Sequence, residues 1–163
     1  KMNIRPTFAY IDSQNLKKSV EQINRKIDYK RFRQYLSKKH NIDRAFMFFG
    51  YIDSQNDTYK YLEKCGFELV FRQVEKINGK RKSNIDICLT IKVLDQIEEF
   101  NTAFLISSDG DFWDLVERLK ERKKFGGIIS PQSSGSCSSL LKKSCGQEKL
   151  SFIPDLIHKF EIR

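Results

Sequence analysis

Short apolar runs alternate along the chain with longer stretches in which apolar residues recur every three or four positions. The short runs predict buried strands, because a strand that is covered on both faces needs few polar positions. The longer stretches have the spacing of amphipathic helices. Strands are predicted at 7–11, 44–51, 67–74, 102–106, 125–129 and, more weakly, 150–153. Helices are predicted just after residue 12 and at 29–39, 57–65, 84–100, 112–119 and 154–160, with a short one from residue 140.

This alternation predicts an α/β fold with three α/β/α layers and a mostly parallel central sheet. The 163 residues fit one domain, and no repeat or linker divides residues 1–163. In such sheets ligands bind beyond the carboxyl ends of the strands, near the point where the strand order reverses. That edge is therefore where candidate chemistry should lie.

The helix at 84–100 is apolar around much of its circumference, so we expect it to be central and well buried. Asp86, in its first turn, is the polar exception. The preceding charged segment, 75–82, predicts a turn centred on Asn78-Gly79.

Four aspartates stand where the predicted sheet edge would bring them together. Asp12 follows the first strand, Asp109 and Asp111 follow the fourth, and Asp86 opens the apolar helix. Converging carboxylates repel unless some are protonated or a cation binds them. Oxygen ligands without nearby His or Cys suit Mg²⁺ or Mn²⁺, which can activate water and polarise a phosphodiester.

Each of these residues also has a simpler interpretation. An Asp between a strand and a helix often only caps the helix, which is worth about 1 kcal/mol. Asp12 and Asp109 both fit that role, and Asp86 could merely favour the helix dipole. The joint placement of all four aspartates is what favours a metal site.

The chain has 30 Lys and Arg against 21 Asp and Glu, a formal net charge of +9. Such an excess suits a polyanionic partner such as a nucleic acid, or simply a solvated surface. Candidate phosphate contacts closely precede Asp86 or follow the first strand, and Tyr51 is a candidate for stacking on an unpaired base. The basic candidates are Lys80, Arg81 and Lys82, followed by Lys17 and Lys18 just after Asn15.

The four cysteines show no Cys-x-x-Cys spacing, and the two histidines are far apart in sequence, which argues against structural zinc. The chain shows no apolar run of membrane-spanning length and no signal pattern at its start. We therefore expect a cytoplasmic protein with reduced thiols and no membrane association.

Three segments together resemble a known family. Tyr10-Ile11-Asp12-Ser13-Gln14-Asn15, Lys82-Ser83-Asn84-Ile85-Asp86 and Leu105-Ile106-Ser107-Ser108-Asp109-Gly110-Asp111-Phe112 are similar, in this order, to the motifs of the NYN (LabA-like) branch of the PIN-like nucleases. The third motif is the most specific of the three. The resemblance extends over nearly the whole chain.

The resemblance implies a PIN-like fold and a Mg²⁺- or Mn²⁺-dependent ribonuclease. Asp12, Asp86, Asp109 and Asp111 would form the acidic metal-binding and catalytic set, with Asn15 positioning the site. Ser107 or Ser108 would offer a hydroxyl to the metal or phosphate. Many members carry a further Asp six residues after Asp86, where this chain has Lys92, so the number of metal ions stays open.

Two other functions remain open. The chain could be a non-catalytic RNA-binding or regulatory module that keeps the fold, or a metal-dependent phosphatase or nucleotide hydrolase. The sequence gives neither the RNA target, single-stranded or structured, nor whether the chain forms a homodimer or acts with a protein partner.

Overall fold

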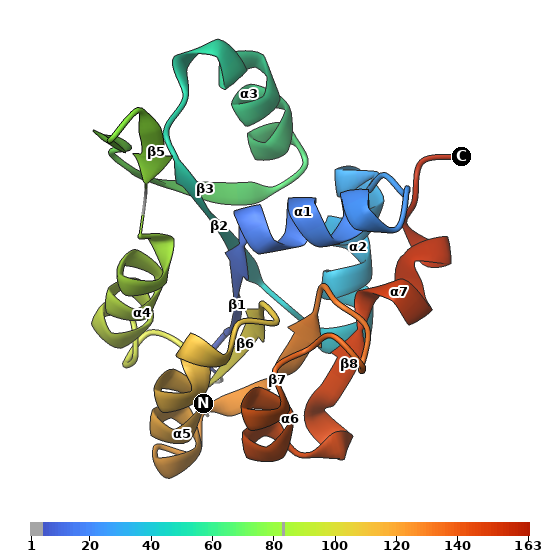
Figure 1. Cartoon of the computed structure of the whole chain (residues 1–163). Helices are drawn as coiled ribbons and strands as arrows, with labels where there is room; N and C mark the ends of the chain where they lie inside the picture. Colours follow the sequence, from blue (N-terminus) through green and yellow to red (C-terminus); the bar gives the residue numbers. More distant parts are fainter. Residues whose placement is uncertain (1–4, 83) are drawn as a thin grey trace.

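Six parallel strands form a central sheet in the computed structural model, which describes residues 5–82 and 84–163 (Figure 1). Their spatial order is β3-β2-β1-β6-β7-β8. The strands are β1 Thr7–Asp12, β2 Arg44–Gly50, β3 Phe67–Arg72, β6 Thr102–Ile106, β7 Phe125–Ser130 and β8 Leu150–Phe152. The predicted α/β fold with a parallel central sheet is confirmed.

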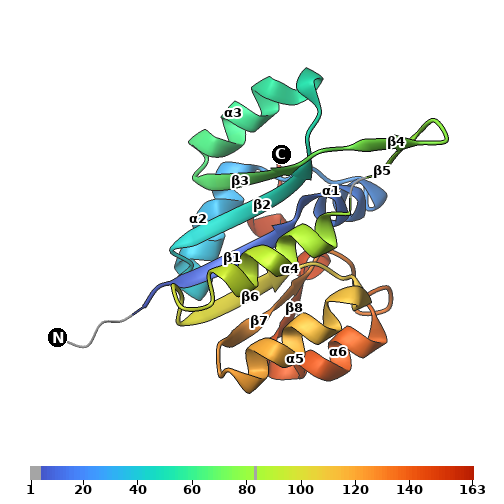
Figure 2. The same ribbon diagram turned by 90° about the vertical axis from the view of Figure 1, so that its left-hand side faces the viewer.

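Helices cover both faces of this sheet. One face carries α1 Ser13–Gln22, α2 Tyr29–His40, α3 Asn56–Lys64 and α7 Ile153–Leu156, and the other carries α4 Ile85–Asp95, α5 Trp113–Glu121 and α6 Ser139–Cys145 (Figures 1 and 2). Short 3₁₀ turns are η1 Asp53–Gln55, η2 Gly110–Phe112, η3 Gln147–Lys149 and η4 Ile157–Lys159. No helix in the described part combines the length and apolar content that crossing a membrane requires.

The central strand β1 supplies both cores. Phe8 and Tyr10 belong to the core beneath α4, α5 and α6, whereas Ala9 and Ile11 belong to the core beneath α1, α2 and α7. Side chains alternate between the faces of a strand, so a strand buried on both faces must be apolar at every position. This explains why residues 8–11 form an unbroken apolar run.

The strand order reverses at β1. The chain runs from β1 outward to β2 and β3 and then returns to place β6 on the other side of β1. Because all three strands are parallel, their carboxyl ends share one edge, and Asp12 lies at the end of β1 opposite Phe48 of β2. The reversal creates the switch point at which α/β sheets bind ligands.

Two sequence expectations need correction here. Residues 75–82 form an antiparallel hairpin, β4 Glu75–Ile77 and β5 Lys80–Lys82, and not merely a turn. Asn78 and Gly79, with φ of 52° and 74°, form its two-residue loop, for which Asn-Gly is a preferred pair. The hairpin extends beyond the carboxyl edge of the sheet (Figure 2).

The second correction concerns α4, which ends at Asp95 and is not fully buried. Ile85, Leu89 and Val93 face the core, but Ile87 and Ile91 are 51% and 54% exposed. The expectation was wrong because an all-round apolar composition does not reveal that only one face of a helix meets the sheet.

One buried hydrogen bond fixes α4 to the sheet. The Tyr10 hydroxyl donates to Oε1 of Gln96, just after α4, at 2.8 Å, and both residues are buried. We expect Tyr10→Phe to lower the free energy of unfolding by about 1–3 kcal/mol, because it leaves the Gln96 carbonyl buried without this donor.

Urea denaturation would measure this loss, with Tyr61→Phe as the matched control because Tyr61 is 48% exposed. Equal stability of the two variants would show that the Tyr10–Gln96 bond does not hold α4 in place.

Candidate functional site

Three aspartates from separate parts of the chain meet at the switch point. Asp12 ends β1, Asp109 lies in the loop after β6, and Asp86 lies in the first turn of α4. One carboxylate oxygen from each lies within 4.8 Å of the other two. Asp12 is only 6% exposed, and the other two are half-buried.

Asp12 is at once a helix cap and a member of this cluster. Its Oδ1 accepts a hydrogen bond from the Asn15 N–H at 3.1 Å, which caps α1. Its Oδ2 lies 3.4 Å from the Ser107 hydroxyl, which donates to it. The cap interpretation and the cluster interpretation therefore both hold, because capping occupies one oxygen and fixes the direction of the other.

Asn15 joins the two loops that carry the cluster. Its Oδ1 accepts two hydrogen bonds from Ser108, from the backbone N–H at 3.0 Å and from the hydroxyl at 2.9 Å. The Ser107 hydroxyl also accepts the Asp109 N–H at 3.1 Å. Ser107 and Ser108 are almost fully buried, so the structure places them as supports of Asp12 and Asn15.

Ser138, at the start of α6, packs against the loop after β6. Oδ1 of Asp109 accepts the Asp111 N–H at 3.0 Å, which opens η2. A Cβ on Gly110 would lie 2.6 Å from the Ser138 hydroxyl oxygen, so any larger residue here would displace the hydroxyl that caps α6. Ser138 itself caps α6 and donates its backbone N–H to the Ser108 carbonyl at 3.3 Å. α6 thus holds the loop in position.

The carboxylates disfavour one another's charge. Burial, and then the negative charges of Asp109 and Asp12, raise the pKa of Asp86 to about 6. Burial likewise raises the pKa of Asp12 above its usual value, against the effect of its hydrogen bond from Asn15. A divalent cation would relieve this repulsion, and a set of carboxylate oxygens fits Mg²⁺ or Mn²⁺.

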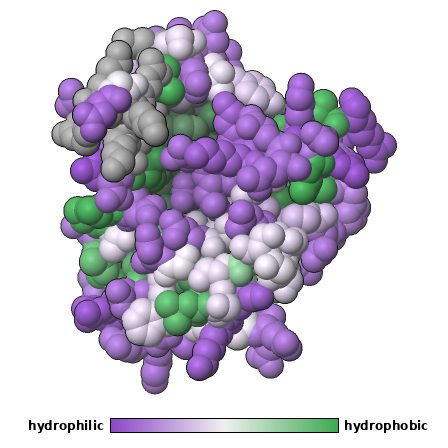
Figure 3. All heavy atoms as spheres, viewed as in Figure 1, coloured by the Kyte–Doolittle hydropathy of each residue, from purple (hydrophilic) through white to green (hydrophobic). Residues whose placement is uncertain are grey.

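A cavity of about 440 Å³ opens over the three aspartates. Hydrophilic side chains gather around this hollowed region, over α1 and the centre of the face drawn in Figure 3. The cavity is lined by Asp12, Gln14, Asn15, Lys18, Asn84, Ile85, Asp86 and Asp109. It therefore combines an acidic floor with a cation, Lys18, on its wall.

The other predicted site residues lie around this centre. Asp111 is exposed on η2; its charge contributes to the raised pKa of Asp86, but it lies outside the set of three whose oxygens converge. Lys17 lines a second cavity between α1 and α3. The Tyr51 ring packs against the rings of Tyr59 and Phe71. The ammonium of Lys92 lies 5.7 Å from the centroid of the Phe46 ring.

The predicted basic cluster Lys80, Arg81 and Lys82 forms the backbone of β5, and its side chains lie outside the described part of the structure. Lys18, expected together with Lys17 as a phosphate contact just after Asn15, lines the acidic cavity, whereas Gln14 and Asn84 were not predicted as site residues. A signal for Gln14 was present, because it lies four residues before Lys18 and so shares one face of α1 with it. No sequence feature of this kind predicts that Asn84 lines the cavity.

The sequence model of the NYN domain family matches residues 6–148 of the chain. Among solved structures, a Vibrio parahaemolyticus protein of unknown function has a similar fold, with a TM-score of 0.78 and 21% identity over 99% of each chain. Curated proteins yield no match.

The raised pKa of Asp86 gives a stability prediction for the metal-free protein. Its folded pKa, about 6, exceeds the ordinary value of 3.8, so its contribution to stability is present below about pH 4 and is lost as pH rises through 6. We expect Asp86→Asn to be more stable than the wild type at pH 7.5, by about 1 kcal/mol after allowance for solvent screening. The difference should vanish near pH 4.

Urea unfolding of both proteins with EDTA at several pH values would measure this difference. Asp95→Asn is the matched control, since Asp95 is exposed near the other end of the same helix. A wild type that gains stability relative to Asp86→Asn as pH rises from 4 to 7.5 would contradict repulsion among the three carboxylates.

Proposed function

Since the chain belongs to the NYN domain family, we propose that it is a Mg²⁺- or Mn²⁺-dependent ribonuclease that hydrolyses phosphodiester bonds of RNA. The family is part of the PIN-like nuclease superfamily, and NYN domains are generally ribonucleases. The observation that carries the proposal is the convergence of Asp12, Asp86 and Asp109 within 4.8 Å at the switch point of the sheet.

The three carboxylates would hold the cation, and the residues behind them keep their oxygens in place. Asn15 and Ser107 donate hydrogen bonds to Asp12, and Asn15 also binds the loop that carries Asp109. When bound, the cation lowers the pKa of a water ligand and offsets the charge of the phosphate. A site built on fixed backbone keeps these groups in one geometry.

Charge around the cavity suits a polyanionic substrate. An acidic pocket alone would repel RNA, but Lys18 lines the same cavity and Lys17 the adjoining one. The net charge of +9 adds a favourable field for RNA over the whole molecule. We propose a cytoplasmic location, where reduced thiols are the rule, for this chain with four free cysteines.

We expect the purified protein to cleave single-stranded RNA when Mn²⁺ or Mg²⁺ is added and to stop when EDTA is added. Asp109→Asn should lower the cleavage rate at least ~100-fold, since it removes a charged ligand of the cation. An asparagine caps a helix as well as an aspartate does, so this loss would not arise from a lost cap.

A gel assay with labelled RNA would measure the rates, with Asp155→Asn on the distant helix α7 as the control. Cleavage that persists in Asp109→Asn would exclude this site as its source. Tight, salt-dependent RNA binding, with no cleavage in the presence of any divalent ion, would support the non-catalytic RNA-binding alternative.

A further inference from the structure

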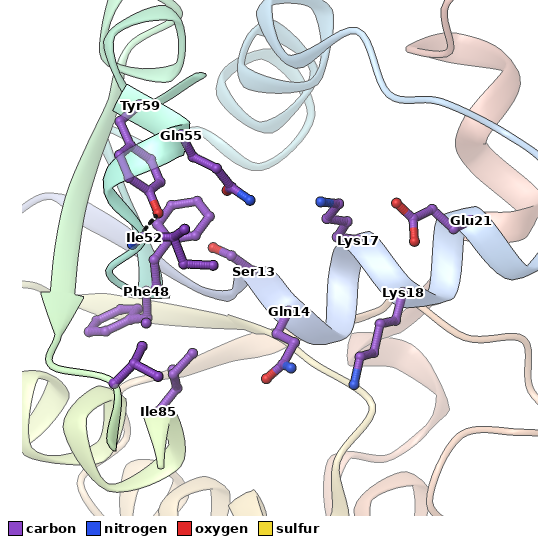
Figure 4. Close-up of a pocket in the computed structure, with 13 residues that line it drawn as sticks. Ser13, Gln14, Lys17, Lys18, Glu21, Phe48, Ile52, Gln55, Tyr59 and Ile85 are labelled. Atoms are coloured by element: carbon purple, nitrogen blue, oxygen red, sulfur yellow. Dashed lines mark hydrogen bonds between the residues drawn. The ribbon is translucent and has the colours of Figure 1, made fainter. Parts of the chain in front are cut away.

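A second cavity, of about 480 Å³, adjoins the acidic one along α1 (Figure 4). Gln14, Lys18 and Ile85 line both cavities, so the two lie directly side by side. The second cavity extends from these shared residues between α1 and the segment that joins β2 to α3. Its volume lies within the range of roughly 300–1,000 Å³ that is typical of small-molecule sites.

Ser13 gives independent evidence that the second cavity is built for a ligand. This residue lines the cavity and is only 4% exposed. Its hydroxyl is buried and has no hydrogen-bond partner among the described residues. A buried hydroxyl without a partner costs free energy, so such groups are rare in the absence of a functional reason. A polar ligand in the cavity would supply the missing partner.

The walls of the cavity have two kinds of surface. Phe48, Ile52 and Ile85 give it an apolar side. Across from them the Gln55 amide and the Lys17 ammonium point toward each other over the cavity (Figure 4). Amides can both donate and accept, as the edge of a nucleobase does, and an apolar wall suits the flat face of a base.

We propose that this cavity holds one unpaired nucleoside of a single-stranded RNA, next to the phosphate that is cleaved over the three aspartates. The proposal rests on the proposed function and specifies its substrate. Because the two cavities adjoin at Gln14 and Lys18, one strand would reach both, with Lys17 and Lys18 near its phosphates. A base in double-stranded RNA is paired and stacked, so it would have to leave the duplex before it could enter the cavity.

Binding of a fluorescein-labelled eight-nucleotide RNA tests this without requiring cleavage. The Asp109→Asn background with EDTA keeps the RNA intact. In this background Ser13→Ala and Gln55→Ala should each weaken binding about 3- to 10-fold, the effect of one lost hydrogen bond. The matched controls Ser37→Ala and Gln34→Ala change exposed residues of α2 and should alter binding less than about 2-fold.

Competition experiments separate the base from the phosphate. Nucleoside 5′-monophosphates should displace the labelled RNA at concentrations at least ~10-fold lower than ribose 5-phosphate, which lacks a base. Ser13→Ala removes no hydrogen bond within the described residues, so its thermal unfolding should match that of the parent protein. That measurement excludes misfolding as the cause of weaker binding.

Two results would overturn the proposal. One is equal RNA affinity of the cavity variants and the α2 controls, and the other is equal competition by ribose 5-phosphate and the nucleotides. Either result leaves the ribonuclease proposal standing if wild-type protein cleaves RNA. Conversely, base-dependent binding by a protein that never cleaves would support the nucleoside cavity and contradict the catalytic function.

Discussion

The repulsion among three carboxylates is the constraint on which the rest of this site depends. Asp12, Asp86 and Asp109 place oxygens within 4.8 Å of one another, and burial together with the neighbouring charges raises the pKa of Asp86 to about 6. Like charges this close separate unless the surrounding structure holds them or a cation neutralises them. The fold holds the three carboxylates together, and the divalent cation of the proposed function would neutralise their charge.

The fold holds the carboxylates through contacts between distant parts of the sequence. Asn15 at the start of α1 accepts two hydrogen bonds from Ser108 after β6, and Ser107 donates to Asp12. Both segments are fixed in turn, because β1 and β6 are neighbouring strands with buried side chains on both faces. Asp12 caps the start of α1, and the next residue, Ser13, lines the second cavity. The acidic centre and the proposed nucleoside site therefore share one rigid element.

The fold class and the approach of the aspartates could be predicted, because both follow from local pattern. A short apolar run such as 7–11 is typical of a strand with two covered faces, and residues that follow parallel strands lie at the same edge of the sheet. Finer features depend on packing that no local pattern encodes. The exposed face of α4, the place of Asp111 beside the cluster, the buried supporting role of Ser108 and the unpartnered hydroxyl of Ser13 all arise from contacts between distant segments.

The proposed metal site is tested most directly by asking whether a divalent ion binds among the three aspartates. Anomalous scattering from a crystal soaked in Mn²⁺ would locate the ion independently of any activity. We expect one peak or two adjacent peaks in contact with carboxylate oxygens of Asp12 and Asp109 and near Asp86. Ordered carboxylates with no anomalous peak at millimolar Mn²⁺, or a peak elsewhere on the molecule alone, would contradict it.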